Sequence, residues 1–386
     1  MSTISGTNAK AWGLAEATFD TVLATAATDA FDFASLDFSP DKSLEELQSH
    51  IGNGSFQGEI DGGTGGKWSA AVDIAPGSVG VAPDVGFMLK AGFGDETIVG
   101  ATSVTYDFND TAPQSLQLTR VSGSTFCEVI NGAWVESITI EGAKGGIPRY
   151  SFAGGFASFG FLYGSVTVSG TQATGATAIV LTTNHGYQVR PGVYVVFGAD
   201  TNSGAGYKVT AVTASGMTIT PGIAGAGVST LTAVTPLDLS QTLTGTRIGG
   251  VSHGLAIDGG SAIGLISAKY AISTGIKALD KESSSAKATA LMRAATRTVD
   301  VELEAYFKHE NLGYFGGAHF TSQVLRSIVT RFGPATAAAR LTVTTPKTLI
   351  KVAEVKLQDN EISTIKIAGR ARQSAAAADE ITALLS

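Results

Sequence analysis

The chain has 386 residues, of which 44% are hydrophobic and 15% charged, with 48 glycines and a formal net charge of -7. This length predicts two or three domains, and the glycine-rich, weakly charged composition favours many short strands and tight turns, hence a mainly β chain. The acidic balance and the lack of Lys/Arg clusters argue against a grip on nucleic acid, although nucleic acid could still slide past the surface.

The single cysteine, Cys127, allows neither an intrachain disulfide nor a paired-cysteine metal site, which fits synthesis in a reducing compartment. The first residues, MSTISGTNAKAWGL, lack the basic and apolar regions of a signal peptide. No apolar run approaches the length of a membrane span. We therefore expect a soluble product made in a cytosol, with no membrane partner.

The first part of the chain, 1–163, contains strand patterns and two expected helices. SPDKSLEELQSH (39–50) predicts a short helix with carboxylates in its early turns. SFQGEIDGGTGGKWSAAVDI (55–74) predicts a hairpin that turns in its glycine-rich centre. APDVGFMLKAGFG predicts a second short helix, capped by Gly94.

The middle part, 164–237, has a different composition. Charged residues almost vanish, strand patterns such as VTVSGTQATGATAIVLTT alternate with glycine turns, and no helix pattern is visible. This pattern predicts a compact β-sandwich or a small barrel, inserted between two other segments.

The last part, 238–386, is similar in composition to the first part. GGAHFTSQVLRSIVTRFGP (316–334) is the best helix pattern in the chain, because its apolar residues recur at helical spacing and Gly333-Pro334 ends it. SSSAKATALMRAA predicts a short amphipathic segment, and SAAAADEITALLS predicts a C-terminal helix or a mobile tail.

The stretch RTVDVELEAYF (297–307) has the most distinctive charge pattern. Read as a strand, it places Asp300, Glu302 and Glu304 on one face and apolar residues on the other. Four interpretations stay open for the acidic face: a metal site, a catalytic acid pair, a solvated surface, or a wall that repels an anion. The spacing disfavours the first two, since carboxylates about 7 Å apart on one strand neither converge on a cation nor oppose each other across a substrate.

Other chemistry-bearing residues form no motif that carries a reaction. The five histidines are scattered, there is no G-x-S-x-G elbow, and GGTGGK lies in an expected hairpin rather than before a helix. Cys127 is expected to be a buried apolar residue. Trp12, Trp68 and Trp134 are expected to be core or subunit-contact anchors. The sequence therefore predicts no enzyme, no cofactor and no metal site.

The two flanks repeat an order of elements. A strand (GKWSAAVDI or RTVDVELEAYF) precedes a loop, a helix (ending KAGFG or TRFG) and a strand, and a strand pair follows (VESITIEGAKGGIPRYSFAGG or VAEVKLQDNEISTIKIAG). A diverged duplication and two unrelated β-rich domains are both open. This order resembles the tail tube protein of long-tailed bacteriophages, in the form with two tube units per chain, over residues 30–161 and 240–372.

The resemblance implies two tandem barrel units, 1–163 and 238–386, around an inserted all-β domain, 164–237. It implies homotrimeric, pseudo-sixfold rings stacked into a tube in the virion tail, assembled in the host bacterial cytoplasm with other phage tail proteins. DNA would pass through the lumen without specific binding. Asp300, Glu302 and Glu304 then become candidate lumen-lining residues that keep phosphates from adhering. Because the inserted domain matches no tube unit, a tail-tip, hub or adhesin-like protein whose central domain binds a surface partner stays open as the alternative.

Overall fold

The computed structural model describes residues 9–46, 59–109, 112–225, 227–249, 253–260, 263–279, 287–306, 325–334, 339–356, 363–373 and 379–386. This part of the chain is mainly β, as predicted, with antiparallel sheets and one α-helix, α1 (Gly86–Phe93). As predicted, α1 is capped by Gly94, which has a left-handed backbone with φ 103°. None of the described helices is both long and apolar enough to cross a membrane. The short 3-10 helices are η2 (Ala27–Asp29), η3 (His185–Gln188) and η4 (Asn202–Gly204).

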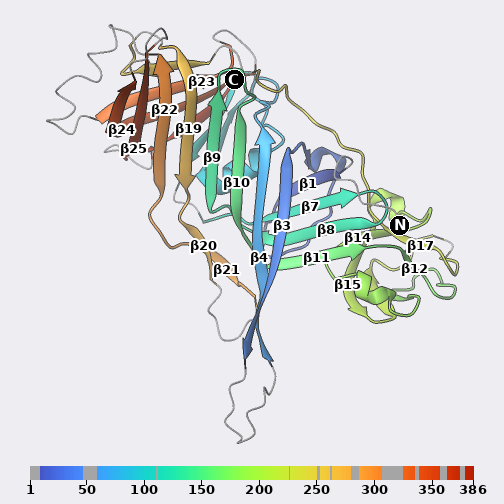
Figure 1. Cartoon of the computed structure of the whole chain (residues 1–386). Coiled ribbons are helices and arrows are strands. Elements are labelled where there is room, and N and C mark those ends of the chain that lie inside the picture. Colours follow the sequence, from blue (N-terminus) through green and yellow to red (C-terminus); the bar gives the residue numbers. More distant parts are fainter. Residues whose placement is uncertain are drawn as a thin grey trace, which may run out of the picture.

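Eight antiparallel strands stand side by side in one long sheet (Figure 1). In sheet order they are β3 (Ser35–Glu46), β4 (Glu59–Asp73), β10 (Arg149–Phe156), β9 (Ser137–Ala143), β19 (Leu265–Ser273), β22 (Thr298–Tyr306), β25 (Thr364–Ala371) and β24 (Leu341–Lys356). Because neighbouring strands alternate in direction, β3 and β24 at the two ends run antiparallel to each other.

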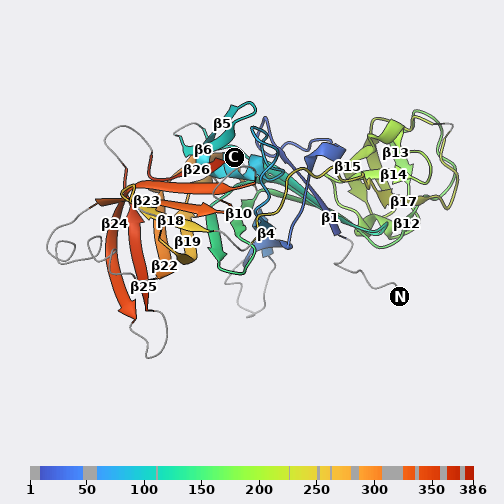
Figure 2. The same ribbon diagram turned by 90° about the horizontal axis from the view of Figure 1, so that it is seen from above.

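Two further layers of strands pack behind the long sheet, and the second is continuous with it through β24. The first has the order β11 (Ser158–Tyr163), β8 (Phe126–Ala133), β7 (Leu116–Ser122), β1 (Ala9–Ala15) and β2 (Ala30–Phe31). The second has the order β18 (Gly254–Ile257), β23 (Leu325–Phe332), the first half of β24, β26 (Thr382–Leu385), β6 (Ser103–Phe108) and β5 (Gly94–Val99). In Figure 2 the strands β23 and β26 run across the direction of β25.

Two groups of strands share one pattern of pairing. In the first unit, β3-β4-β10-β9 lie in the long sheet and β11-β8-β7-β1 lie behind it. In the second unit, β19-β22-β25-β24 lie in the long sheet and β26-β24-β23-β18 lie behind it. The chain visits the corresponding strands in the same order, and the passage from β8 to β9 corresponds to the bend within β24. The two units meet where β9 pairs with β19.

The two units also share an Ala-Gly pair at one position of this pattern. Gly154 in β10 pairs with Trp68, and Gly369 in β25 pairs with Val301. A Cβ on Gly154 would lie 1.8 Å from the carbonyl oxygen of Trp134, and a Cβ on Gly369 would lie 2.8 Å from that of Leu349. Both carbonyls belong to the bend that leads from the rear sheet into the long sheet, so glycine is required at the same place in each unit.

Alternate side chains of the long sheet point into a single continuous core. Its largest fully buried members from the long sheet are Tyr150, Phe152, Phe156 and Tyr270. Helix α1 contributes Met88, Leu89 and Phe93, all fully buried. The other face of the long sheet carries polar and small side chains, and we call it the open face.

Residues 166–236 form a separate small barrel beside the first unit (Figure 1). Its strands have the order β12 (Val166–Thr167), β17 (Ala233–Pro236), β14 (Tyr194–Phe197), β15 (Tyr207–Thr213), β16 (Gly216–Thr220) and β13 (Ala178–Val180). The Ser169 N–H donates to the Val180 oxygen at 2.8 Å and the Thr182 N–H to the Thr167 oxygen at 3.0 Å, which joins β13 back to β12. The core of this barrel continues into the first rear sheet through Trp12, Cys127 and Leu162.

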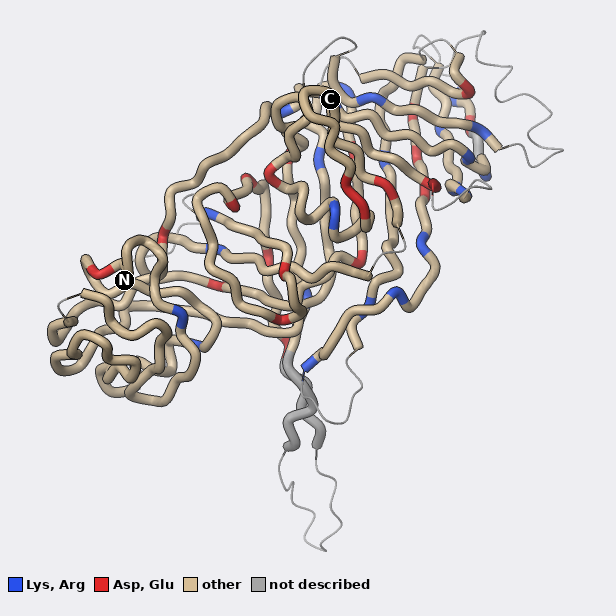
Figure 3. The backbone as a smooth tube through the Cα atoms, turned by 180° about the vertical axis from the view of Figure 1, so that it is seen from behind, with Lys and Arg blue, Asp and Glu red and all other residues tan. Residues whose placement is uncertain are grey.

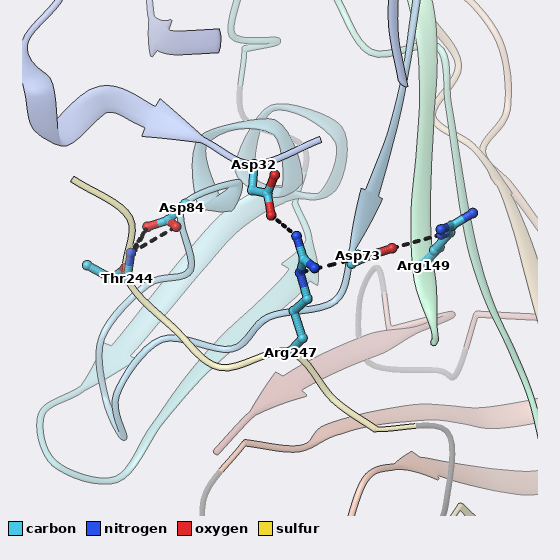
Figure 4. A network of polar contacts seen from close by, with 6 residues as sticks. All are labelled: Asp32, Asp73, Asp84, Arg149, Thr244 and Arg247. Atoms are coloured by element: carbon cyan, nitrogen blue, oxygen red, sulfur yellow. Dashed lines mark hydrogen bonds and ion pairs between the residues drawn. The ribbon is translucent and has the colours of Figure 1, made fainter. Parts of the chain in front are cut away.

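The segment 237–249, which we call the strap, returns from this barrel across the first unit. Backbone N–H groups of the strap donate to carbonyl oxygens of the first unit: Thr242 to Ala27 at 3.0 Å, Thr246 to Pro76 at 3.1 Å and Ile248 to Ile74 at 2.9 Å. Figure 4 shows the side chains that add to these bonds. Arg247 pairs with Asp32 and Asp73, and Asp84 accepts three hydrogen bonds from Thr244.

Two predictions for the first unit are wrong. Residues 39–46 belong to strand β3 rather than to a helix, and the glycine-rich stretch lies within the continuous strand β4 rather than in a turn. The pairing of β3 with β4 extends from Ser35 to Glu46, so pairing with another segment of the chain prevails over the local helix pattern. The rest of the expected 39–50 helix lies outside the described residues.

The expected helix at 316–334 is also wrong where it can be compared. Residues 325–332 form strand β23, which is paired on both sides, by β18 and β24. Its burial alternates, with Ile328, Thr330 and Phe332 buried, so period two prevails over the helical spacing. Residues 316–324 lie outside the described part. In the described part of the expected C-terminal helix or mobile tail, the chain forms β26, which is held between β24 and β6; residues 374–378 lie outside the described part. The amphipathic segment contains a strand, β21 (Ala290–Arg293), paired with β20 (Ile276–Leu279).

Candidate functional site

The open face of the long sheet contains a hollow of about 630 Å³. Its lining comes from six neighbouring strands, β10, β9, β19, β22, β25 and β24, together with the turn between β9 and β10. The charged lining residues are Glu141, Arg149, Lys269, Glu302, Glu304, Glu354 and Lys366. A hollow shared by neighbouring strands of one sheet indicates that the sheet curves, with the open face on its concave side.

The predicted acidic face lies on this surface. Asp300, Glu302 and Glu304 point to the open face at alternate positions of β22, while Val299 and Val301 between and beside them are buried. The division of this strand into an apolar core face and an acidic outer face is therefore confirmed. In the structure the three carboxylates lie in a row along one strand and do not converge on one point.

Each of these carboxylates stands opposite a cation on a neighbouring strand. Asp300 is paired with Arg370, Glu302 with Lys269 and Glu304 with Lys366. Arg370 donates two hydrogen bonds to Asp300, at 2.7 and 2.9 Å, and these bonds lower the pKa of the Asp300 carboxyl below its usual value. Directly paired residues on an antiparallel sheet have their Cβ atoms about 5 Å apart, close enough for opposite charges to attract.

The alternation of charge extends across the junction of the two units. One row of paired residues crosses five strands, in the order Asp73, Arg149, Glu141, Lys269 and Glu302. Its first members form an ion pair of 2.8 Å. Figure 3 shows acidic and basic residues interspersed along these strands rather than separated into fields. The acidic stripe visible in the sequence is thus one line of a mixed-charge surface.

A metal site is not supported on this face. Within the residues described, no group of three or more His, Cys, Asp or Glu side chains could hold a metal ion. The hydrogen bonds from Arg370 favour the ionised form of Asp300, which has no proton to donate as a general acid.

The other residues singled out in the sequence lie elsewhere. Cys127 is buried, as predicted, and burial raises the pKa of its thiol. Trp12 and Trp68 are core residues, whereas Trp134 is partly exposed and donates to Glu136 at 3.0 Å. The stretch GGTGGK is part of β4. His185 and His253 accept backbone hydrogen bonds from Thr167 and Gly333, at 3.0 and 3.3 Å. His50, His309 and His319 lie outside the described residues.

The two ends of the long sheet are candidate assembly features, and the sequence did not show which strands form them. Among the described residues, β3 is paired only with β4, and residues 350–356 of β24 are paired only with β25. Each therefore presents an unpaired row of backbone donors and acceptors, which is a ready template for another strand. Pro40 within β3 was the available signal, because proline in a strand is typical of a sheet edge.

A buried carboxyl in the first unit was also missed. Glu16 is 4% exposed and accepts hydrogen bonds from the Ser115 hydroxyl, the Gly132 N–H and the Asp20 N–H, at 2.6, 2.8 and 3.0 Å. Burial raises the pKa of Glu16 to about 7 in spite of these bonds. Nothing in the local sequence distinguishes this residue from an exposed glutamate.

Comparison with known proteins adds no relative. No protein-family model matches the chain, and no curated protein matches it. The resemblance to tail tube proteins therefore rests on the order of elements in the sequence.

Proposed function

We propose that this chain is a structural subunit that assembles with copies of itself into rings, and that the rings stack into a tube like the tail tube of long-tailed bacteriophages. The observation that carries the proposal is the junction between the two units inside one chain. There β9, the last strand of one four-strand unit, pairs antiparallel with β19, the first strand of the next. The same two edges recur unpaired at the ends of the long sheet, as β24 and β3.

Repetition of this junction between chains adds one long sheet to the next. Because β3 and β24 run antiparallel, the ring continues the alternation of strands without a reversal. Three chains with eight long-sheet strands each would give 24 strands and six units. The pseudo-sixfold symmetry of the ring would come from the pairing pattern shared by the two units.

The stagger of the strands supports closure into a cylinder. The row of paired residues that begins at Asp37 passes through Ser69, Ala153 and Ser137 and arrives at Ser273. Lys269 corresponds to Asp37, because each stands two strands away from the alanine of the shared Ala-Gly pair. Ser273 lies four positions further along β19 than Lys269 (273 − 269).

The pairing thus shifts by four residues over each four-strand unit. Summed around the ring, the total stagger, counted in residues, equals the number of strands. With strand spacings of about 4.8 Å and a rise of about 3.3 Å per residue, this corresponds to a tilt of roughly 35° and a backbone diameter of roughly 45 Å. That lumen is wide enough for a DNA duplex to pass.

The open face would line the lumen. Its charges fit a passage rather than a binding site, because Lys269, Lys366 and Arg370 already face carboxylates and gain little from a DNA phosphate. Asp300, Glu302 and Glu304 would thus act in two ways: they pair with these cations, and they repel the phosphates of DNA. DNA would pass along the lumen without specific binding, and the proposal assigns no reaction, cofactor or metal to the chain.

The subunit would belong to the virion tail, after assembly in the cytoplasm of a bacterial host. Its partners would be two further copies in each ring, the rings above and below, and other tail proteins. The paired strands β3 and β4 extend along the strand direction beyond the neighbouring strands of the long sheet, where they could reach a neighbouring ring (Figure 1).

Imaging of the purified protein tests this function. Negative-stain micrographs and light scattering over a range of concentrations should give rings of three subunits or stacked tubes with a central channel. Monomers at every concentration and salt would overturn the proposal.

The alternative is a tail-tip, hub or adhesin-like protein whose inserted barrel binds a surface. One observation favours it: the barrel exposes Tyr187 at 71% and Leu231 at 74%. Because Val166 pairs with Val234, a short linker can replace residues 166–236. If the truncated chain still forms tubes, the barrel only decorates them. If tubes are lost while the chain stays folded, the barrel belongs to the assembly.

A further inference from the structure

We infer that, in the ring, Lys356 of one copy stands directly opposite Asp37 of the next copy, with Glu354 opposite Ser39. This inference rests on the proposed ring and specifies its junction residue by residue. The occupant of each sheet edge is a second copy of this chain. Three features support the assignment: the pairing pattern of the two units, the exposure of the edge residues and their charges.

The shared Ala-Gly pair fixes the correspondence between the units. On one side, Gly154 pairs with Trp68, which pairs with Phe38. On the other side, Gly369 pairs with Val301, which pairs with Tyr270. Beside the two glycines, the corresponding positions therefore carry apolar side chains in both units, and the aromatic residues Phe38 and Tyr270 occupy the same place at the edge of their units.

The next row of paired residues extends this correspondence to residues whose side chains point to the open face. Ala153 pairs with Ser69, which pairs with Asp37, and Ala368 pairs with Glu302, which pairs with Lys269. Asp37 in β3 thus occupies the place that Lys269 holds in β19.

The last strand of each unit follows in the same way. Ala153 pairs with Ser137 in β9, and Ala368 pairs with Val352 in β24. Four residues further along each strand lie Glu141 and Lys356, so Lys356 in β24 occupies the place that Glu141 holds in β9.

Within the chain, Glu141 stands directly opposite Lys269 across the junction of the units. If the junction between chains copies this one, Lys356 stands opposite Asp37. Both residues are exposed in the single chain. The charges are again opposite, but their signs are exchanged between the two strands.

This exchange of signs distinguishes the junction within the chain, between β9 and β19, from the junction between chains, between β24 and β3. If β24 met a β19 edge, Lys356 would face Lys269, and if β9 met a β3 edge, Glu141 would face Asp37. Both mismatches place like charges directly opposite each other, which is unfavourable in a sheet. The pattern therefore favours strict alternation of first and second units around the ring.

The backbone at the β3 edge can accept the incoming strand. In the in-chain junction the Lys144 N–H donates to the Ile266 oxygen at 2.7 Å, which makes Glu141 and Lys269 a pair without direct backbone bonds, the type with the closest side chains. In the same alternation, the acceptor next to Asp37 that faces the incoming strand is the Leu36 carbonyl, which corresponds to the carbonyl of Ala268. The Leu36 carbonyl already accepts a hydrogen bond from Arg120 and keeps a second lone pair for the next copy.

Disulfide trapping tests the register. The chain has one cysteine, the buried Cys127, so added surface cysteines report without interference. The double variant Lys356→Cys/Asp37→Cys should form covalent trimers as the largest oxidised species, and dithiothreitol should release them. The matched control Lys356→Cys/Asp41→Cys moves the second thiol four residues along β3, beyond disulfide reach, and should not cross-link.

The outcomes separate this inference from the proposed function. Trimers in the first variant support both, whereas rings or tubes that cross-link only in the control overturn the register and leave the tube intact. Rings or tubes of the first variant that do not cross-link under oxidation also overturn the register. Absence of any assembly in the unsubstituted protein overturns the proposed function, and the register falls with it.

Charge exchange gives a second, independent readout in the intact protein. Lys356→Asp and Asp37→Lys each create a like-charge pair and should raise the protein concentration needed for assembly about two- to fivefold per junction. The double exchange restores opposite charges and should return assembly to within about twofold of the unsubstituted protein. A double variant that assembles no better than either single variant would overturn the pairing.

Discussion

Arg370 and Asp300 stand opposite each other on β25 and β22, where the guanidinium donates two hydrogen bonds to one carboxylate, at 2.7 and 2.9 Å. Asp300 lies at one end of the acidic stripe on the open face, and its pairing with Arg370 neutralises the charge there. Both side chains remain about two-fifths exposed, at 45% and 42%, so solvent screening keeps the contribution of the pair to stability small. Its consequence lies in the charge that the surface presents.

We predict that Arg370→Gln raises the pKa of Asp300 toward the ordinary aspartate value, because the hydrogen bonds from Arg370 are the main cause of its depression. A depressed carboxyl stabilises the fold above the unfolded pKa, and this contribution is lost as pH falls through the folded pKa. Carboxyl-carbon NMR titration of labelled aspartate measures the shift. Arg372→Gln, just beyond the same strand, is the control, and an equal shift in both variants would contradict the assignment.

The buried Glu16 predicts a pH dependence of the opposite sign. Its folded pKa of about 7 exceeds the unfolded value, so the folded state binds the additional proton between roughly pH 4.5 and 7. The stability contributed by Glu16 is therefore complete below this window and declines as pH rises through it. Glu16→Gln should remove this decline, with a difference of roughly 2 to 3 kcal/mol between the two ends of the window.

Urea unfolding at pH 5 and pH 8 measures this effect. The glutamine variant should lose less stability between the two pH values than the unsubstituted protein. The control is Glu354→Gln, an exposed carboxylate on the open face that should leave the pH dependence unchanged. Parallel pH profiles for the unsubstituted protein and Glu16→Gln would show that Glu16 titrates in its ordinary range.

The sequence allowed the mainly β class and the two faces of β22 to be predicted, because composition and period-two alternation are local properties. Helix α1 was also predicted from its cap at Gly94. The region of β23 was not, since Ile328 and Phe332 satisfy helical spacing and strand alternation equally well. Only the pairing with β18 and β24 decides between them. Such pairing joins residues far apart in the chain, which local patterns do not encode.

The site was predicted only in part for the same reason. Asp300, Glu302 and Glu304 were visible as a stripe, but their partners Arg370, Lys269 and Lys366 come from strands before and after β22. Charge balance on a sheet depends on register across strands, and one strand read alone shows a single sign. The sequence did not show which strands form the sheet edges, because being an edge is a property of the whole sheet.

The two corresponding glycines give a graded prediction of stability. Gly154→Ala places a Cβ 1.8 Å from a backbone oxygen, whereas Gly369→Ala places it 2.8 Å away. The neighbour is backbone in each case, so relief requires a shift of the strand bend. We expect losses of about 3 kcal/mol or more for Gly154→Ala and about 1 to 2 kcal/mol for Gly369→Ala.

Denaturant midpoints of the purified variants measure this order. Gly100→Ala is the control, because a Cβ there meets nothing within 4 Å. Equal losses for Gly154 and Gly369, or a loss at Gly100 as large as either, would contradict the close approach at the bend.

The strap gives the last prediction, because Thr244 attaches it to the first unit through both its hydroxyl and its backbone N–H. The Thr244 hydroxyl donates to Asp84 at 2.6 Å, and the Thr244 N–H donates to both oxygens of the same carboxyl at 3.0 and 3.1 Å. Burial raises the pKa of Asp84 against these bonds, so the carboxylate depends on its donors. Thr244→Val removes the hydroxyl donor and should cost about 1 kcal/mol, while the strap opens more often.

Limited proteolysis within residues 237–249, followed by mass spectrometry, measures this opening. Cleavage of Thr244→Val should be several-fold faster than cleavage of the unsubstituted protein, since a loss of about 1 kcal/mol raises the open population about fivefold. Thr246→Val is the matched control, because its contact with the first unit is a backbone N–H to Pro76 that valine retains. If both variants are cleaved at the same rate, the Thr244 hydroxyl does not hold the strap. The strap would then be held by its backbone bonds and by the ion pairs of Arg247.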